Sequence, residues 1–328
     1  MQSWDATKDA ALKEAWGVYR TWAKTSRTNA LQLRRSRWSV LILAISGSAL
    51  STAGQFVHSS AIATDKISLV HRALGSLGAI ALALGTYLTR ELVTEEAQRK
   101  WLRSRAIAEG AKSECFLFRL GVSPYDGPDS TQKLLDVLIL QRRLVAGLTH
   151  DVMSNAEYVE RLPIGPLTIR DYVRSRVEDQ IAWYDKAIAS NIRSIGRSRT
   201  ITVVLGGVSV VLSIVALNNA GAEFVPLVAS LTVALASSVA AAQYGYLIAS
   251  YQATGDQLRA LKQEWSLSDH PECDDAIFQF AKGCERAMAS ENSAWMAKLS
   301  ENLLQAQRAR ISETATHVID HAAQNGPD

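Results

Sequence analysis

The sequence predicts an all-α membrane protein made of two tandem units, each a two-span transmembrane hairpin extended by long cytoplasmic helices. Three observations support this fold class. Four long segments lack charged side chains, the segments form two closely spaced pairs, and positive charge gathers on one side of both pairs. No stretch of strand-forming residues alternates with a period of two, so a sheet is not expected.

The four apolar segments are long enough to cross a membrane as helices. They are Trp38–Val57, Ala73–Thr89, Thr200–Ala222 and Phe224–Leu247. A helix rises about 1.5 Å per residue, so each segment covers most or all of a hydrocarbon core about 30 Å thick. The short connection within each pair leaves no room for a soluble domain. We therefore expect four helical spans arranged as two hairpins.

Basic residues set the expected orientation of both hairpins. One side carries Arg34, Arg35, Arg37, Arg90, Arg99, Lys100, Arg103, Arg105, Arg193, Arg197, Arg199, Arg259 and Lys262. The other side has only Lys66 and Arg72. By the positive-inside rule, both termini and the segment between the hairpins are expected in the cytoplasm.

The flanking segments are predicted to be amphipathic helices that continue the spans. Apolar residues recur every three or four positions between Asp5 and Arg37, and again from Val173 to Ile188. Thr168 and Asp171 resemble a capping box, so a helix should begin there. Loops are expected at Gly121–Asp129 and Leu162–Pro166, with a helix from Thr131 to Val159 between them. The last helix, Asp274 to about Ile319, has an apolar stripe that needs a partner: Ile277, Ala281, Cys284, Met288, Trp295, Leu299 and Leu303.

Comparison of the chain with itself indicates a duplication. At one constant offset, Lys24, Asn29, Arg35, Ser36 and Arg37 fall on Lys186, Asn191, Arg197, Ser198 and Arg199, and each set leads directly into a hairpin. The sequence therefore predicts a first unit at residues 1–162, with spans at about 38–57 and 73–89. A second unit follows at residues 163–328, with spans at about 200–222 and 224–247 and a C-terminal helix.

Composition and motifs argue against an enzyme. The net charge is only +3, and its position beside the spans is explained by topology, so no nucleic-acid contact is predicted. The three cysteines, Cys115, Cys273 and Cys284, form no CxxC pair, which argues against a disulfide framework and a zinc site. No phosphate-binding loop or hydrolase motif is present, and the adjacent His150 and Asp151 fit an ordinary polar helix face. We expect no catalytic residue, no metal and no cofactor.

Small and polar residues in the spans suggest where helices approach closely. The fourth span has Ser230, Ala234, Ser238 and Ala242 at successive fours, with Ser237 and Gln243 beside them, and the second span has Gly75, Gly78, Ala79, Ala83 and Gly85. One interpretation is packing within a four-span bundle. The other is a polar seam that opens into a pore in an oligomer. A small transporter is a third alternative, although no charged residue lies within a span.

Several motifs resemble the SLATT family, the two-span effector domains found beside prokaryotic nucleotide-signalling and SLOG sensor proteins. The first motif, which starts the domain, contains Tyr172, Arg176, Gln180, Trp183, Tyr184 and Asn191. Glu285 to Trp295 is similar to the closing helix of that family. The segment with Trp101, Arg105 and Glu109, followed by Lys112 and Glu114, is similar to the helix after the hairpin in a related subgroup.

The resemblance implies a function that composition and residue spacing do not indicate. It implies a pore-forming membrane effector of a prokaryotic antiviral or abortive-infection system, located in the bacterial inner membrane and active as a homo-oligomer. The implied partners are the lipid bilayer and a cytosolic sensor, a nucleotide-generating enzyme or another defence-system protein. The alternative is a membrane scaffold that docks a soluble sensor or polymerase without conducting ions. The activating ligand and the number of subunits do not follow from the sequence.

Overall fold

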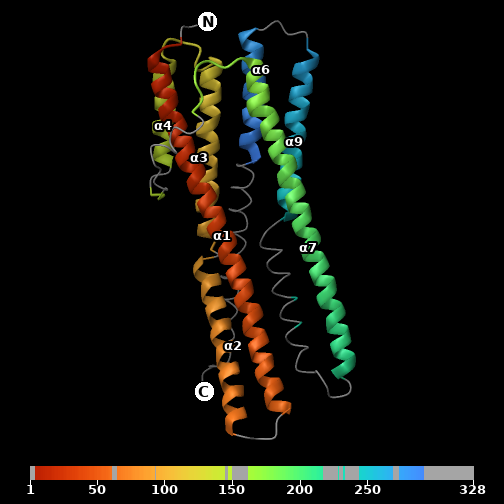
Figure 1. Cartoon of the computed structure of the whole chain (residues 1–328). Coiled ribbons are helices and arrows are strands. Elements are labelled where there is room, and N and C mark those ends of the chain that lie inside the picture. The colour runs from red at the N-terminus through yellow and green to blue at the C-terminus, as the bar shows by residue number, and fades with distance from the viewer. Residues whose placement is uncertain are drawn as a thin grey trace, which may run out of the picture. The chain divides into compact units, whose positions relative to one another are not determined.

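The structure is a computed structural model, and it describes residues 4–60, 65–92, 94–144, 147–149, 162–216, 228, 232, 244–268 and 273–291. Every regular element in this described part is a helix (Figure 1). The elements are α1 (Ala6–Ser60), α2 (Asp65–Leu92), α3 (Glu95–Leu120), α4 (Ser130–Leu144), α6 (Ile169–Tyr172), the π-helix η1 (Val173–Glu178), α7 (Asp179–Ala216) and α9 (Tyr244–Leu267). Residues 274–291 are also helical. The all-α prediction is therefore confirmed for these residues.

The chain divides into two compact units, and each unit combines segments from both halves of the sequence. Unit 1 comprises Met1–Ser26, Gln98–Pro166 and Glu272–Asp328, and unit 2 comprises Arg27–Ala97 and Leu167–Pro271. The units describe packing, whereas the boundary after residue 162 concerns the sequence repeat and stays a prediction.

Unit 1 has a hydrophobic core built from amphipathic helices. The first turns of α1 supply Leu12 and Trp16, α3 supplies Cys115, and α4 supplies Leu134 and Leu138, all of them buried. The recurrence of apolar residues every three or four positions places them on one side of each helix, where they leave water together. The predicted amphipathic helix from Asp5 is thus confirmed, and its apolar face is covered within the unit.

The C-terminal stripe is also covered in unit 1. Ala281, Cys284 and Met288 are buried in the helix at residues 274–291, and Glu291 of this helix forms an ion pair with Arg105 of α3. The expected need for a partner helix is met within the chain. Trp295, Leu299 and Leu303 lie outside the described residues.

The loops and the helix start agree with the sequence patterns. Residues 121–129 separate α3 from α4, and α4 begins at Ser130. The predicted helix from Thr131 to Val159 is wrong in its length, because α4 ends at Leu144 and residues 147–149, with Gly147 at φ 93°, are not helical. Residues 145–146 and 150–161 lie outside the described part. The Thr168 hydroxyl accepts a hydrogen bond from the Asp171 backbone N–H at 3.1 Å, so Thr168 is the N-cap that was predicted. Arg119 donates to the carbonyl of Gly165 at 3.0 Å, which fixes the second loop on the end of α3.

Unit 2 contains an antiparallel pair of helices formed by α2 and the C-terminal part of α1, which lie side by side in Figure 1. A β-carbon added to Gly78 would lie 2.8 Å from the Gly47 carbonyl oxygen and 2.9 Å from the Ser51 nitrogen. Gly54 faces α2 in the same way, since its added β-carbon would lie 3.3 Å from the nitrogen of Gly75. The helices approach so closely because glycine has no side chain at these positions.

This contact refines the prediction for the small residues of the second span. Gly78 and Gly85 are buried toward α1, whereas Ala79 and Ala83 are exposed. The close approach therefore follows one glycine stripe, and the neighbouring alanines lie on another face of the helix.

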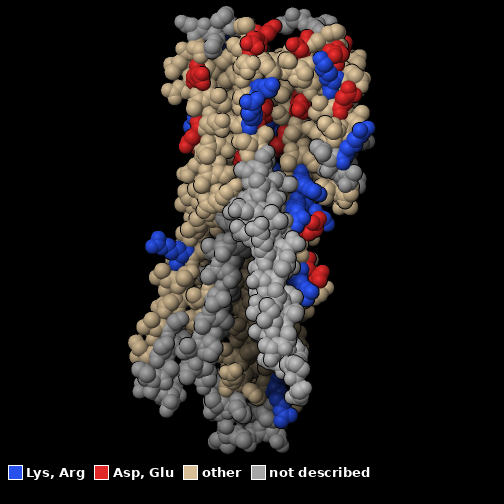
Figure 2. Space-filling model, turned by 180° about the vertical axis from the view of Figure 1, so that it is seen from behind, with Lys and Arg blue, Asp and Glu red and all other residues tan. Residues whose placement is uncertain are grey.

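One helix segment among the described residues meets the length and composition of a membrane span. It is Leu69–Leu92 in α2, which contains an 18-residue stretch with mean hydropathy 1.4, of which only 11% is buried. Residues 38–57 are helical within α1, and 200–216 are helical within α7, but residues 217–222 and most of 224–247 lie outside the described part. Figure 2 shows charged side chains gathered toward one end of the visible face. The four-span hairpin arrangement stays a prediction.

Candidate functional site

The first family-like motif forms a buried face on α6, η1 and the start of α7. Tyr172, Val177 and Tyr184 are at most 1% exposed, and Arg176 is 2% exposed. Arg176 and Val177 are adjacent and both buried in η1, a π-helix, in which one turn holds an extra residue. Gln180 and Asn191 are half-buried, whereas the Trp183 ring lies at the edge and is partly exposed.

The partner of this face in unit 2 is α9. The Tyr251 ring lies 5.4 Å from the Trp183 ring and 5.6 Å from the Tyr184 ring, measured between centroids. Gly255 lies beside Tyr184, and an added β-carbon would stand 3.8 Å from the Tyr184 β-carbon. The sequence analysis missed Tyr251 and Gly255. The spacing of the buried residues Tyr251, Thr254, Gly255 and Leu258 on α9 is the signal that could have found them.

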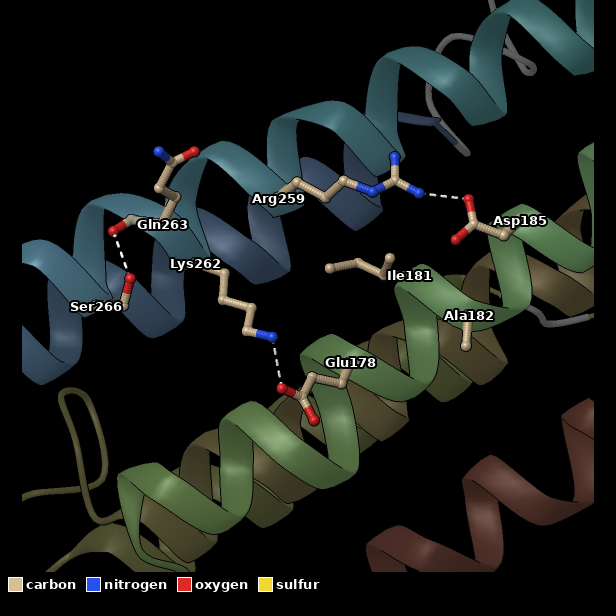
Figure 3. A pocket seen from close by; sticks show the side chains of 8 residues that line it. All are labelled: Glu178, Ile181, Ala182, Asp185, Arg259, Lys262, Gln263 and Ser266. Carbon is tan, nitrogen blue, oxygen red and sulfur yellow. Dashed lines mark hydrogen bonds and ion pairs between the residues drawn. The ribbon is translucent and has the colours of Figure 1, made fainter.

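A groove of about 550 Å³ runs between α7 and α9 (Figure 3). Two ion pairs cross it. Lys262 Nζ lies 2.5 Å from Glu178 Oε1, and Arg259 pairs with Asp185 as well as with Asp256 on its own helix. The hydrogen bond to Asp185 is the main reason that the pKa of Arg259 is raised.

The side chains that line the groove are suited to joining its two helices. Its two cations each face a carboxylate, so its lining has no excess charge to attract an ion. The Ser266 hydroxyl donates to the carbonyl of Gln263 at 2.8 Å, so this hydroxyl is engaged in a local hydrogen bond. Both ion pairs are partly exposed, and each such pair contributes about 0–1 kcal/mol.

The second and third family-like segments meet in unit 1. Arg105 from α3 donates to Glu291 Oε2 at 2.8 Å, and the Glu291 side chain is only 1% exposed. Burial raises the pKa of Glu291, the Arg105 charge lowers it in part, and nearby Glu109 raises it. Trp101 is half-buried on the same helix. Trp295 lies outside the described residues.

A second buried carboxylate, Glu114, lies on α3. The Tyr125 hydroxyl donates to Glu114 Oε2 at 2.5 Å. Burial is the main cause that raises the pKa of Glu114; the Tyr125 hydrogen bond lowers it and Glu285 raises it further. Burial also raises the pKa of Tyr125, as does the neighbouring Glu114 charge. The cluster of Arg105, Glu109, Glu114, Glu285 and Glu291 is called the acidic cluster below.

The described residues contain no group of three or more His, Cys, Asp or Glu side chains that could hold a metal ion. Cys115 and Cys284 are buried and Cys273 is exposed, all as free thiols. The six candidate pore-lining residues of the fourth span lie outside the described part of the chain: Ser230, Ala234, Ser237, Ser238, Ala242 and Gln243. Their role stays a prediction.

Two family models match the chain. Residues 172–295 match the SMODS and SLOG-associating 2TM effector domain 1, and residues 18–133 match a protein family of unknown function (DUF4231). No curated protein and no solved structure matches significantly. The first match begins at Tyr172, the buried last residue of α6, and includes Glu291 of the acidic cluster. Residues 172–295 are thus similar to the SLATT family of two-transmembrane effector domains.

Proposed function

We propose that this protein is a membrane effector of a prokaryotic antiphage or abortive-infection system. A cytosolic sensor or a nucleotide signal triggers it, and the triggered protein oligomerises and permeabilises the inner membrane. The observation that carries the proposal is the match of residues 172–295 to a two-transmembrane effector domain.

The apolar surface of unit 2 supports a place in the membrane. Large apolar side chains point outward from three helices: Trp38 on α1, Leu69 on α2 and Val203 on α7 are each at least 60% exposed. Contiguous apolar surface of this kind is unfavourable in water and favourable in lipid. We therefore propose two spans from α1 and α2 and two more from α7 and the segment before α9, with both termini cytoplasmic.

The proposal of a homo-oligomer rests on the pore. Four helices of one chain enclose little space, so a water-filled path requires several chains. The apolar stripe of the last helix no longer motivates an oligomer, because Ala281, Cys284 and Met288 are buried within unit 1 and Ile277 is half-buried there.

The direct test measures membrane potential. The protein is expressed in a bacterial host with its neighbouring genes, and the cells are challenged with phage in the presence of a potential-sensitive dye. We expect loss of potential before lysis and arrest of growth. Ser238→Leu and Ala242→Leu should abolish both effects, because a large side chain prevents close approach of the fourth span.

The matched control is Val233→Leu, which we place on the lipid-facing side of the same span. This variant should stay toxic at equal abundance in the membrane. If triggered cells die with full potential, or if the Ser238 and Ala242 variants stay toxic, the pore mechanism is wrong and the scaffold alternative takes its place. A nucleotide cyclase, reverse transcriptase or SLOG protein encoded beside the chain would favour the defence role.

A further inference from the structure

Six arginines of unit 2 border the apolar segments. Arg34, Arg35 and Arg37 precede residue 38 on α1, Arg90 follows residue 89 on α2, and Arg197 and Arg199 precede residue 200 on α7. All lie within four residues of a predicted span, which is about 6 Å along a helix and comparable to the headgroup layer of a bilayer. These six residues are called the arginine layer below.

No member of the arginine layer is paired with a carboxylate in the described part of the protein, although Glu91 follows Arg90 on α2. None of its six guanidinium groups forms an ion pair with a described carboxylate, whereas Arg105, Arg142, Arg174 and Arg259, which lie further from the spans, each do. Five of the six side chains are exposed, and Arg37 is half-buried. A group of like charges that are not paired with carboxylates favours anions from outside.

Arg37 is the most constrained member of the layer. It continues the stripe of α1 that faces α2, since Val40, Ala44 and Gly47 follow it at steps of three and four and lie against α2. Its Nε is buried and has no hydrogen-bond partner among the described residues. Burial lowers the pKa of Arg37, and Tyr244 at the start of α9 is close enough to interact with its charge. A desolvated cation without a counter-ion is unfavourable, so an anion here would be stabilising.

The neighbouring surface identifies the source of that anion. Trp38 and Tyr87 are about 60% exposed beside Arg37 and Arg90, and Ile201 and Val203 follow Arg199 with outward-facing side chains. Aromatic residues next to basic residues are typical of a membrane–water interface. An arginine fork matches the geometry of a phosphate, and basic residues at an anionic leaflet gain about 1 kcal/mol each.

We propose that the arginine layer binds anionic phospholipids and that Arg37, with Tyr244 beside it, holds the phosphate of one headgroup. This inference rests on the proposed insertion in the membrane. The guanidinium supplies the charge and its orphaned Nε–H a donor. The layer thereby fixes the depth of α1, α2 and α7 in the bilayer. The position of these helices therefore depends on anionic lipid.

Trp38, adjacent to Arg37, is a built-in reporter. The protein and its Trp38→Phe variant are reconstituted in phosphatidylcholine vesicles that contain either brominated phosphatidylglycerol or brominated phosphatidylcholine at equal mole fraction. The difference between the two proteins isolates the quenching of Trp38. We expect phosphatidylglycerol to quench it more strongly, and its local enrichment to fall about fivefold in Arg37→Gln, the equivalent of one basic contact.

Control variants separate the site from folding. Arg37→Lys keeps the charge and should keep much of the preference, whereas Arg174→Gln removes an exposed arginine paired with Asp171 and should change nothing. Arg34→Gln with Arg35→Gln tests the exposed part of the layer, where no packing is disturbed. Each variant is checked for its helix content.

Three outcomes overturn the lipid site: equal quenching by both lipids, an unchanged preference in Arg37→Gln, or loss of the preference when inorganic phosphate is added, which would show a site for free anions. Extraction with alkaline carbonate separates this result from the proposed function. Wild-type protein released by carbonate contradicts membrane insertion. Arg37→Gln protein that stays embedded but loses the lipid preference supports the site.

Discussion

Unit 1 contains two buried carboxylates, each of which has a single side-chain partner at hydrogen-bond distance. Arg105 and Glu291 form an ion pair in which the carboxylate is almost completely removed from water. Replacing only one partner of such a pair costs about 3–5 kcal/mol, because the other charge is left buried. Glu114 is the gentler probe, since its hydrogen bond from Tyr125 needs an acceptor and not a charge.

Glu114→Gln should stabilise unit 1 at pH 8 and have little effect at acidic pH. Burial raises the pKa of Glu114 above its ordinary value of 4.5. The folded state therefore binds the proton more tightly than the unfolded state, and the stability of the wild type falls as pH rises from 4.5 through the raised pKa. Glutamine never ionises and still accepts from Tyr125. Thermal unfolding at both pH values should show a gain of about 2–4 °C for each kcal/mol recovered, at pH 8 only.

The control for this prediction is Glu14→Gln. Glu14 is exposed and pairs with Arg142, so its loss should change stability by less than about 1 kcal/mol. If the stability of the wild type and of Glu114→Gln changed with pH in the same way, burial would not control the ionisation of this carboxylate.

At the scale of elements, the α1–α2 pair depends on positions where the backbones touch. Gly47 on α1 and Gly78 on α2 leave no room for a methyl group, and Gly54 on α1 leaves little. Gly75 on α2 faces open space. Packing of small residues is the main attraction between helices in lipid, because the lipid tails are as apolar as the side chains. The seam therefore holds the pair together more than its apolar outer faces do.

Gly78→Ala should weaken the α1–α2 pair, and Gly75→Ala should not. The new methyl group at position 78 meets the Gly47 carbonyl and the Ser51 backbone nitrogen, neither of which can rotate away. Overpacking of this kind costs about 1–3 kcal/mol. Denaturation of the reconstituted protein with a harsh detergent compares the two variants. Equal midpoints would contradict the tight seam.

At the scale of the whole molecule, the two halves of the sequence are interleaved. The closing segment of the SLATT match lies in unit 1 with α3, which belongs to the other family match. The first helix, α1, contributes residues to both units. Neither half of the sequence forms a compact unit by itself, and the acidic cluster contains residues of both matches.

The proposed topology predicts the outcome of reporter fusions. Fusions after residues 30, 150 and 328 should be cytoplasmic, and fusions near Ala61 and Ala220 should be external, because basic residues flank the spans on one side only. A periplasmic reporter signal from the fusion at residue 150 would rule out four spans. The fusion at residue 328 is the matched control, since it shares the expected compartment.

Sequence alone determined the structural features that depend on residues close to one another in the sequence. Helical periodicity placed the amphipathic part of α1, the Thr168 cap followed from a local side-chain to backbone hydrogen bond, and the loop before α4 followed from glycine and proline. Each arises from residues a few positions apart, whose geometry is the same in almost any fold. The family motifs also pointed to residues that proved to be buried, such as Tyr172 and Tyr184.

Only the tertiary structure decided which helix faces which. Arg105 and Glu291 are 186 positions apart, and nothing local to either residue selects the other among the many charged residues of the chain. Nothing local to Trp183 selects Tyr251 as its partner either. Likewise, the sequence around Gly78 and Ala79 does not decide that Gly78 faces α1 and that Ala79 is exposed. Periodicity defines a face but not its partner, because any complementary helix could cover it. The choice of partner is made by close packing and by the cost of burying unpaired charge, and both depend on the folded chain as a whole.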